Sequence, residues 1–421
     1  MEEQHAYKMN TKEKILFALM QLFFIATIFP YNDVLTGFIT GGMMLSCVLF
    51  NSFKEKLSLL KERKYIIWMF LFFLWVFISV VTSKDVHEGF SFLDPRLPLF
   101  YFPLTVGLVN IRREFKERIL LGFAVITTVF CAICLISAII NYIRSGNVDY
   151  LYSDAITMLS GQQAIYISLL VNFSIYIFCL FIFFRPYRFK AIMIFALLFL
   201  FFISFILGSR NMMLVLYSFV LIFLAYYIFK KKKYTAGTTM LIAVLLAGFL
   251  VLHFFPKTIN RFKDFAYTQY DYQHEGSESH YSKETTPDQW NGANFRIAAW
   301  RCGWELFKKN PIAGTHLGDK REKLIEKYKE KNFQFALRTN KNLHNNYLDI
   351  LVATGIIGLV LFLIAWLFLP FIRAYIYKDY LSVSILVTFA IAIVTEVYFD
   401  RSFGGMLFGF FIPFLLSDKK R

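Results

Sequence analysis

The chain has 421 residues, of which 57% are hydrophobic and only 18% are charged. Soluble domains carry clearly more charge, about a quarter of their residues, so this composition excludes an ordinary soluble globular protein. The formal net charge of +16 invites a nucleic-acid-binding interpretation. We exclude a nucleic-acid partner because the basic residues stand in short clusters between apolar runs, which is the pattern of membrane orientation signals.

Long apolar runs recur along the whole chain, and runs of about 18 or more such residues are candidates for transmembrane helices. Segments of about ten alternating residues, typical of a transmembrane barrel, do not occur in the sequence. We therefore predict an all-α polytopic membrane protein with about twelve transmembrane helices. The expected spans are 14–30, 33–50, 65–83, 96–110, 118–142, 156–184, 189–208, 211–229, 236–255, 345–370, 380–398 and 404–416.

Two of these spans need comment. The first begins near Lys14 and has no small-residue cleavage site after it, so we expect it to stay in the protein rather than to be removed as a signal. The fourth contains Pro98 and Pro103. We expect this span to be broken or re-entrant, since irregular backbone in a membrane occurs where protein or a cavity surrounds it.

The basic clusters set the expected orientation. They lie at 8–14, 54–64, 112–118, 185–190, 230–233, 373–378 and 419–421. All fall on one side if the chain crosses the membrane at each expected span, so both termini are expected in the cytoplasm. The domains are then transmembrane helices 1–9 over 1–255, a loop domain over 256–343, and helices 10–12 over 344–421.

The polar stretch 256–343 faces outward in this topology, into the periplasm if the cell is Gram-negative. Within it we expect a helix over 294–309, with Asn294 as its N-cap and Asn310-Pro311 as its stop. A charged, solvated helix is expected over 319–335.

The strongest local motif opens the tenth expected span, as Leu343-His344-Asn345-Asn346, and is followed by Gly355 and Gly358. At about 100° per residue, both glycines would share a helix face with His344 and form a groove for a helix or a lipid chain. Histidine titrates near neutral pH and can take a proton from a hydroxyl group. The structural alternative, a polar residue at the membrane interface above packing glycines, has about equal weight on spacing alone.

Two arginines are candidates for binding phosphate. Arg210 lies in a short outer loop, against the positive-inside bias, and its planar guanidinium suits bidentate phosphate contact. Arg296 falls in the first turn of the expected helix 294–309, an end that favours anions and that cations normally avoid. Each arginine also has a non-functional interpretation. Arg210 would extend its side chain to the lipid headgroups, and Arg296 would be an ordinary surface residue.

Taken together, two arginines and a histidine describe one site. The arginines would hold a pyrophosphate, and His344 would activate a hydroxyl group. Pyrophosphate leaves as a stable anion, so this displacement needs no carboxylic acid of the kind that glycosidases use. The loop has no pair of carboxylates suited to a divalent metal, so we expect neither a metal nor another cofactor.

Weaker candidates surround this group. Glu396 and Asp400 lie near the outer end of an apolar span, where carboxylates are costly and often functional; an internal ion pair with an arginine of the site is the favoured alternative. Trp300 and Trp304 follow Arg296 at spacings of four. The two tryptophan rings would stack on sugars or, as is more common, lie in the membrane interface.

These residues resemble a known family. His344-Asn345, nine residues, Gly355, two residues and Gly358 resemble the motif of bacterial O-antigen ligases and related oligosaccharyltransferases. The run from Arg296 to Trp300, and the expected topology with one large late outer loop, are similar to the same superfamily. The motif is shared with O-antigen polymerases and protein O-glycosyltransferases.

The resemblance implies a GT-C-like membrane fold and a metal-independent, inverting glycosyltransferase. It implies transfer of O-antigen polysaccharide from undecaprenyl pyrophosphate to the lipid A-core at the periplasmic face, among membrane lipids. It assigns pyrophosphate binding to Arg210 and Arg296 and a base-like role to His344, with Asn345 and the glycines in support.

Three alternatives stay open. An O-antigen polymerase uses the same donor but tends to have two comparable outer loops, and only one is large here. A protein O-glycosyltransferase usually continues past the last span. A membrane transporter, from another functional class, predicts charges at the midplane and repeated halves, of which the sequence gives little sign.

Overall fold

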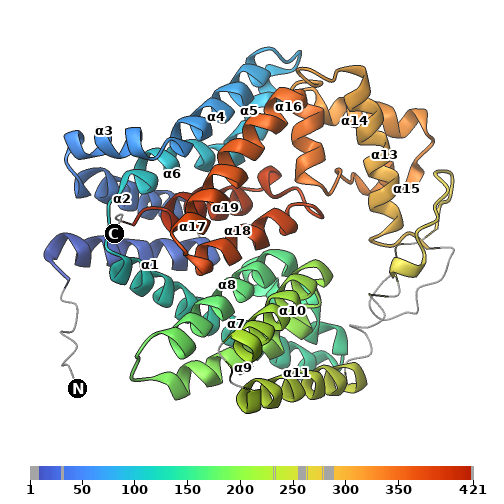
Figure 1. Cartoon of the computed structure of the whole chain (residues 1–421). Helices are drawn as coiled ribbons and strands as arrows, with labels where there is room; N and C mark the ends of the chain where they lie inside the picture. The colour runs from blue at the N-terminus through green and yellow to red at the C-terminus, as the bar shows by residue number, and fades with distance from the viewer. Residues whose placement is uncertain are drawn as a thin grey trace.

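The computed structural model describes residues 9–29, 33–230, 232, 234–254, 262, 264–276, 278 and 289–418. Within these residues the chain forms helices and no β-strand, with two isolated bridges, Ile111 with Asp418 and Glu278 with Trp290. Figure 1 shows the helices in chain order. The predicted all-α class is confirmed for this part of the chain.

The first half of the chain contains α1 (Thr11–Ile28), α2 (Asp33–Phe50), α3 (Phe53–Glu62), α4 (Tyr65–Val81), α5 (Val86–Leu93), η1 (Asp94–Arg96), α6 (Pro98–Thr105), η2 (Val106–Leu108), α7 (Arg113–Ser145), η3 (Val148–Leu151), η4 (Ser153–Ser160), α8 (Ala164–Phe184) and α9 (Lys190–Leu207). The second half contains α10 (Arg210–Ala225), η5 (Tyr226–Lys230), α11 (Tyr234–Phe254), η6 (Asp264–Ala266), α13 (Asn294–Lys309), α14 (Lys320–Glu330), α15 (Gln334–Thr339), α16 (Asn346–Phe362), η7 (Leu363–Phe368), α17 (Leu369–Ile376), α18 (Tyr380–Ala392), η8 (Tyr398–Asp400) and α19 (Ser402–Leu415).

Six helical segments of the described chain are long and apolar enough to cross a membrane. They are Asp33–Phe50, Arg113–Ser145, Ala164–Phe184, Lys190–Leu207, Arg210–Lys230 and Asn346–Ile376. The pair α3 and α4, bent by 86°, passes the same test when taken together. The chain is therefore a multi-pass membrane protein, and the count of about twelve spans remains a prediction, as do the GT-C likeness and the periplasmic placement of the loop.

The proline-rich segment 96–110 is broken, as the sequence predicts. It consists of the short helix α6 between the 3-10 turns η1 and η2. The segment lies against α19, where Gly405 and Gly409 let the carbonyl groups of Pro95 and Pro98 approach so closely that a Cβ atom would collide with them. Glycine is therefore required at this crossing.

The polar segment has a hydrophobic core of its own. Trp290, Phe295, Tyr328, Phe333 and Phe335 are buried together between α13, α14 and α15. This cluster continues onto the first turns of α16, and Figure 1 shows α13, α14 and α15 gathered beside that end of α16. The core holds the start of α16 in a fixed position relative to α13.

A loop before α14 attaches this segment to α4. The backbone N–H groups of Leu317 and Gly318 donate to the hydroxyl oxygens of Ser79 and Ser83, at 2.9 Å each. The Asp319 carboxylate accepts two further backbone N–H groups at the start of α5. These bonds are buried or half-buried, so the polar segment docks on the helical body through satisfied polar groups.

Two expectations for the polar segment need correction. Asn294 is the first residue of α13 and not its cap, because Asn291 Oδ1 accepts the N–H groups of Ala293 and Asn294 at 2.8 and 3.0 Å. The expected helix 319–335 is two helices, α14 and α15, separated at residues 331–333. The stop at Asn310 is confirmed, since α13 ends at Lys309.

Candidate functional site

The turn Thr395-Glu396, between α18 and η8, is where three distant parts of the chain meet. Asn211, in the first turn of α10, donates from Nδ2 to the Thr395 hydroxyl oxygen at 2.9 Å. Arg296 of α13 donates from Nε to the Thr395 carbonyl oxygen at 3.1 Å. His344 Nδ1 lies 2.9 Å from Glu396 Oε2. One turn therefore fixes the segments that carry all three predicted site residues.

The two arginines converge over Gly292. Arg210 opens α10 after Ser209, which follows the left-handed Gly208, and Arg296 lies in the first turn of α13. A Cβ atom at Gly292 would lie 2.9 Å from Arg296 Nη1 and still closer to Arg210 Nη2. Any larger residue at position 292 would have to displace one or both guanidinium groups from this point.

Uncharged groups contact both guanidinium groups, and Arg296 also interacts electrostatically with Glu396. Arg296 Nη1 donates to the Gly292 carbonyl oxygen at 2.6 Å, and the Arg210 guanidinium carbon lies 5.5 Å from the centre of the Phe265 ring. Both arginines also stand at helix N-termini, where free N–H groups favour anions. Two guanidinium groups in this arrangement suit a diphosphate, with its several acceptor oxygens.

His344 has a strained backbone. Its φ of 45° lies in the left-handed region, which non-glycine residues rarely adopt. The side chain of Asn342 accepts the His344 N–H at 3.0 Å, and Asn345 caps α16 by accepting the N–H of Leu348 at 3.0 Å. Asn345 therefore shapes the turn that presents the imidazole, and its observed contacts are structural.

The pair of His344 and Glu396 has the geometry of a base and its orienting carboxylate. A carboxylate only accepts hydrogen bonds, so the proton between the two lies on Nδ1, which leaves the Nε2 lone pair of a neutral ring to act as a base. The imidazole side chain is 22% exposed while the carboxylate is 10% exposed. The imidazole ring packs edge-on against the Phe295 ring, with 5.7 Å between the two ring centroids.

Glu396 stays ionised in this setting. Burial raises the pKa of its carboxyl, but His344 and then Arg296, with a backbone N–H from Val397, outweigh it and lower the pKa below its ordinary value. The partner that we expected for this carboxylate was an arginine, and its bonded partner is the histidine of the motif. Spacing along the chain does not predict this pair, because 52 residues separate His344 from Glu396.

The two tryptophans have different surroundings. Trp300 Nε1 donates to the carbonyl oxygen of Leu343 at 2.9 Å, which anchors the segment leading into His344. Trp304 is 47% exposed and packs on Phe307. Trp304 is therefore the tryptophan of the pair whose ring is open to a sugar or to the membrane interface.

Asp400 belongs to a neighbouring buried cluster rather than to the His344 group. Its Oδ1 lies 2.7 Å from Lys320 Nζ and 2.9 Å from Arg96 Nη2, and Asp349 on α16 binds the same two cations. Arg401, its chain neighbour, is not among these partners. Sequence reasoning missed Arg96, Lys320 and Asp349, although a carboxylate inside the apolar run of α16 was a usable signal.

Contrary to our expectation, the glycines of the motif do not share one helix face with His344, although α4 lies close to α16 at Gly358 through Trp75. Gly355 has φ 66° and ψ −168°, which breaks α16 and ends any common face with His344. A Cβ atom there would collide with the backbone of Ile312, and one on Gly358 would collide with the side chain of Thr354, with Trp75 behind it. The loop that follows α13 therefore occupies the space beside Gly355, where we expected room for a helix or a lipid chain.

A helical, multi-pass membrane protein that holds two guanidinium groups beside a histidine–carboxylate pair has the parts of a membrane transferase acting on an anionic donor. Residues 195–363 match the family model described as O-antigen ligase, so this part of the chain is similar to that family. The range includes Arg210, Arg296 and His344, while Glu396 lies beyond it. Comparison with curated protein sequences finds no match.

Proposed function

We propose that the protein is an O-antigen ligase that transfers O-antigen polysaccharide from undecaprenyl pyrophosphate to the lipid A-core. The family match supports an enzyme of O-antigen processing with glycosyltransferase-like activity. The observation that carries the finer proposal is that the turn Thr395-Glu396 binds Arg296, His344 and Asn211, while Arg210, the residue before Asn211, meets Arg296 over Gly292.

The donor binds through its pyrophosphate. The guanidinium groups over Gly292 contact its oxygens and stabilise the charge that develops on the leaving group. Because this leaving group is already an anion of low basicity, no general acid is needed on the donor side. The reaction requires no metal ion in this scheme, since the arginines supply the positive charge.

The acceptor is activated by His344. Its Nε2 takes the proton from an acceptor hydroxyl group while the oxygen forms a bond to the anomeric carbon of the donor. The bond from that carbon to the phosphate oxygen breaks, and undecaprenyl pyrophosphate leaves with the bonding pair. Glu396 stabilises the imidazolium that results. A single displacement of this kind inverts the anomeric centre.

The positive-inside pattern supports a periplasmic location for this site, with both termini in the cytoplasm. Undecaprenyl-linked donor, lipid A-core and the surrounding inner-membrane lipids are then the partners. The oligomeric state does not enter the proposal.

The test uses purified protein in proteoliposomes with undecaprenyl-pyrophosphate-linked polysaccharide and rough lipopolysaccharide. Wild type and a His87→Ala control, which alters an exposed histidine of α5, should produce polymer-bearing lipopolysaccharide, and His344→Ala should not. Growth of the lipid-linked chain without acceptor would favour the polymerase. Movement of the donor across the bilayer without transfer would favour the transporter.

A further inference from the structure

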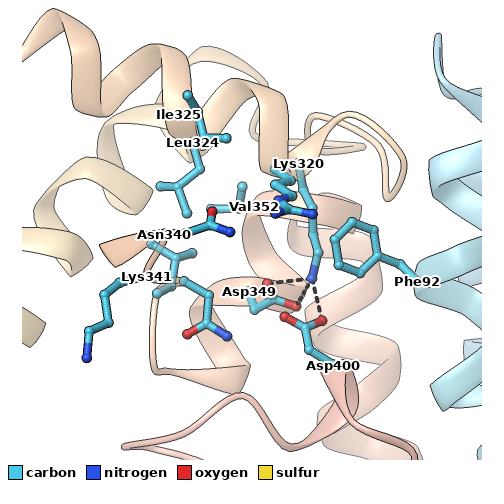
Figure 2. Close-up of a pocket in the computed structure, with 12 residues that line it drawn as sticks. Phe92, Lys320, Leu324, Ile325, Asn340, Lys341, Asp349, Val352 and Asp400 are labelled. Carbon is cyan, nitrogen blue, oxygen red and sulfur yellow. Dashed lines mark hydrogen bonds and ion pairs between the residues drawn. The ribbon is translucent and has the colours of Figure 1, made fainter. Parts of the chain in front are cut away.

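A cavity of about 190 Å³ lies beside the candidate site, between α14, the segment 340–343, α16 and η8. Its lining residues are Phe92, Lys320, Arg321, Leu324, Ile325, Asn340, Lys341, Asn342, Leu343, Asp349, Val352 and Asp400. Figure 2 shows this cavity, with the Asn340 amide and the ion cluster on opposite sides. None of the proposed donor-binding residues lines it.

The wall is built from fixed polar groups. Lys320 Nζ lies 2.8 Å from Asp349 and 2.7 Å from Asp400, and its ammonium sits 4.4 Å from the centre of the Phe92 ring. Arg96 binds both carboxylates from outside the cavity lining. Burying four charged groups is costly unless they are paired, so this part of the wall is rigid and its side chains stay in place.

The chemistry of the lining suits a sugar. The carboxylate oxygens accept hydrogen bonds from hydroxyl groups, while the amide groups of Asn340 and Asn342 both donate and accept. Lys320 and Arg96 match the two carboxylates. The other two cations of the lining, Arg321 and Lys341, pair with Glu88 and Glu278, so the lining has no unmatched charge that would select a charged ligand. Leu324 and Val352 add apolar surface for the C–H face of a ring. Such a mixture is typical of a small-molecule site, where a few polar groups converge in a partly apolar pocket.

The cavity is joined to the catalytic residue through Asn342. This side chain lines the cavity, and its Oδ1 accepts the N–H of His344 at 3.0 Å. Leu343, the next lining residue, directly precedes His344 and is held by Trp300. A ligand in the cavity therefore lies beside the segment that holds His344 in its left-handed conformation.

We propose that this cavity is the acceptor subsite, which holds one sugar residue of the acceptor glycan next to the attacking hydroxyl group. The inference rests on the proposed function and names the side from which the second substrate approaches. The cavity volume of about 190 Å³ is smaller than the roughly 300–1,000 Å³ of pockets for drug-sized ligands. The cavity is therefore the right size for a single sugar unit.

The first experiment removes the Asn340 amide without disturbing the backbone. Asn340 has φ 49°, which glycine adopts freely, so Asn340→Gly keeps the turn. The matched control is Asn332→Gly, an exposed asparagine with φ 55° that does not line the cavity. Loss of one hydrogen bond should raise the acceptor KM about three- to tenfold and leave the donor KM unchanged.

The second experiment fills the cavity. Ile325→Trp should reduce binding of delipidated core oligosaccharide to the full-length protein, measured without donor by calorimetry, whereas Ile312→Trp, at a position outside the lining that is 65% exposed, should not. Unchanged acceptor KM in Asn340→Gly with unchanged binding in Ile325→Trp would overturn the subsite. If wild type makes no polymer-bearing lipopolysaccharide at all, the proposed function fails instead.

Discussion

The His344–Glu396 pair gives the sharpest mechanistic prediction. Glu396→Gln keeps the shape of the side chain and a hydrogen-bond acceptor for Nδ1 at 2.9 Å, but it removes the negative charge that stabilises the imidazolium. A hydrogen bond to a charged group contributes about 1.5–3 kcal/mol, and about 1.4 kcal/mol corresponds to a factor of ten. We therefore expect kcat to fall about 10- to 100-fold, with little change in the KM for either substrate.

The assay is the initial rate of polymer transfer at saturating donor and acceptor. Because His344 and Arg296 hold the pKa of Glu396 below its ordinary value of about 4.3 in spite of burial, the carboxylate is ionised throughout the neutral range. The charge that Glu396→Gln removes is therefore present in the wild type at every pH of the assay. The matched control is Glu305→Gln, which removes a carboxylate that pairs with lysines of the polar segment. A wild-type rate in Glu396→Gln, or an equal loss in the control, would refute the reasoning.

Three further changes test other parts of the structure. Gly292→Ala places a methyl group against both guanidinium groups, so the donor KM should rise about tenfold or more. The control Gly37→Ala, whose added methyl group meets nothing within 4 Å, should have the wild-type donor KM. A Gly292→Ala protein with the donor KM of the control would contradict a binding point shared by the two arginines. Burial raises the pKa of Asp400, but Lys320 and then Arg96 outweigh it and lower this pKa to about 2, so the stabilisation from its ion pairs is lost as pH falls from about 3.9 to that value. The thermal midpoint of wild type in detergent should therefore drop through this acid range, and that of Asp400→Asn should start lower and change less; parallel curves would contradict this. Gly355→Ala forces a side chain into φ 66° and against the loop after α13, so the thermal midpoint should fall clearly, and an unchanged midpoint would show that the break in α16 relaxes.

The sequence predicts the local features of this protein well. Apolar runs locate most helices to within a few residues, and Asn310 marks the end of α13 correctly. The prolines of segment 96–110 predict its break. The motif around His344, together with Arg296, points to residues that the structure brings to one turn, and Arg210 meets Arg296 over Gly292.

What the sequence does not predict depends on contacts between distant segments. Glu396 pairs with His344, and Asp400 with Lys320, because the chain from α18 to η8 folds back beside the start of α16. Hydropathy and spacing carry no information about such a return. Gly355 was interpreted with a regular helix period, and the approach of the loop at Ile312 overrides that period.

The central claim is that Arg210, Arg296 and His344 form a single site for a lipid-linked diphosphate and an attacking alcohol. The most direct measurement is a structure of the His344→Ala protein in lipid nanodiscs with undecaprenyl pyrophosphate bound. Both phosphates should lie at the guanidinium groups over Gly292, beside the position that the imidazole occupies in the wild type. Phosphates bound elsewhere, or the two arginines turned to separate compartments, would contradict it.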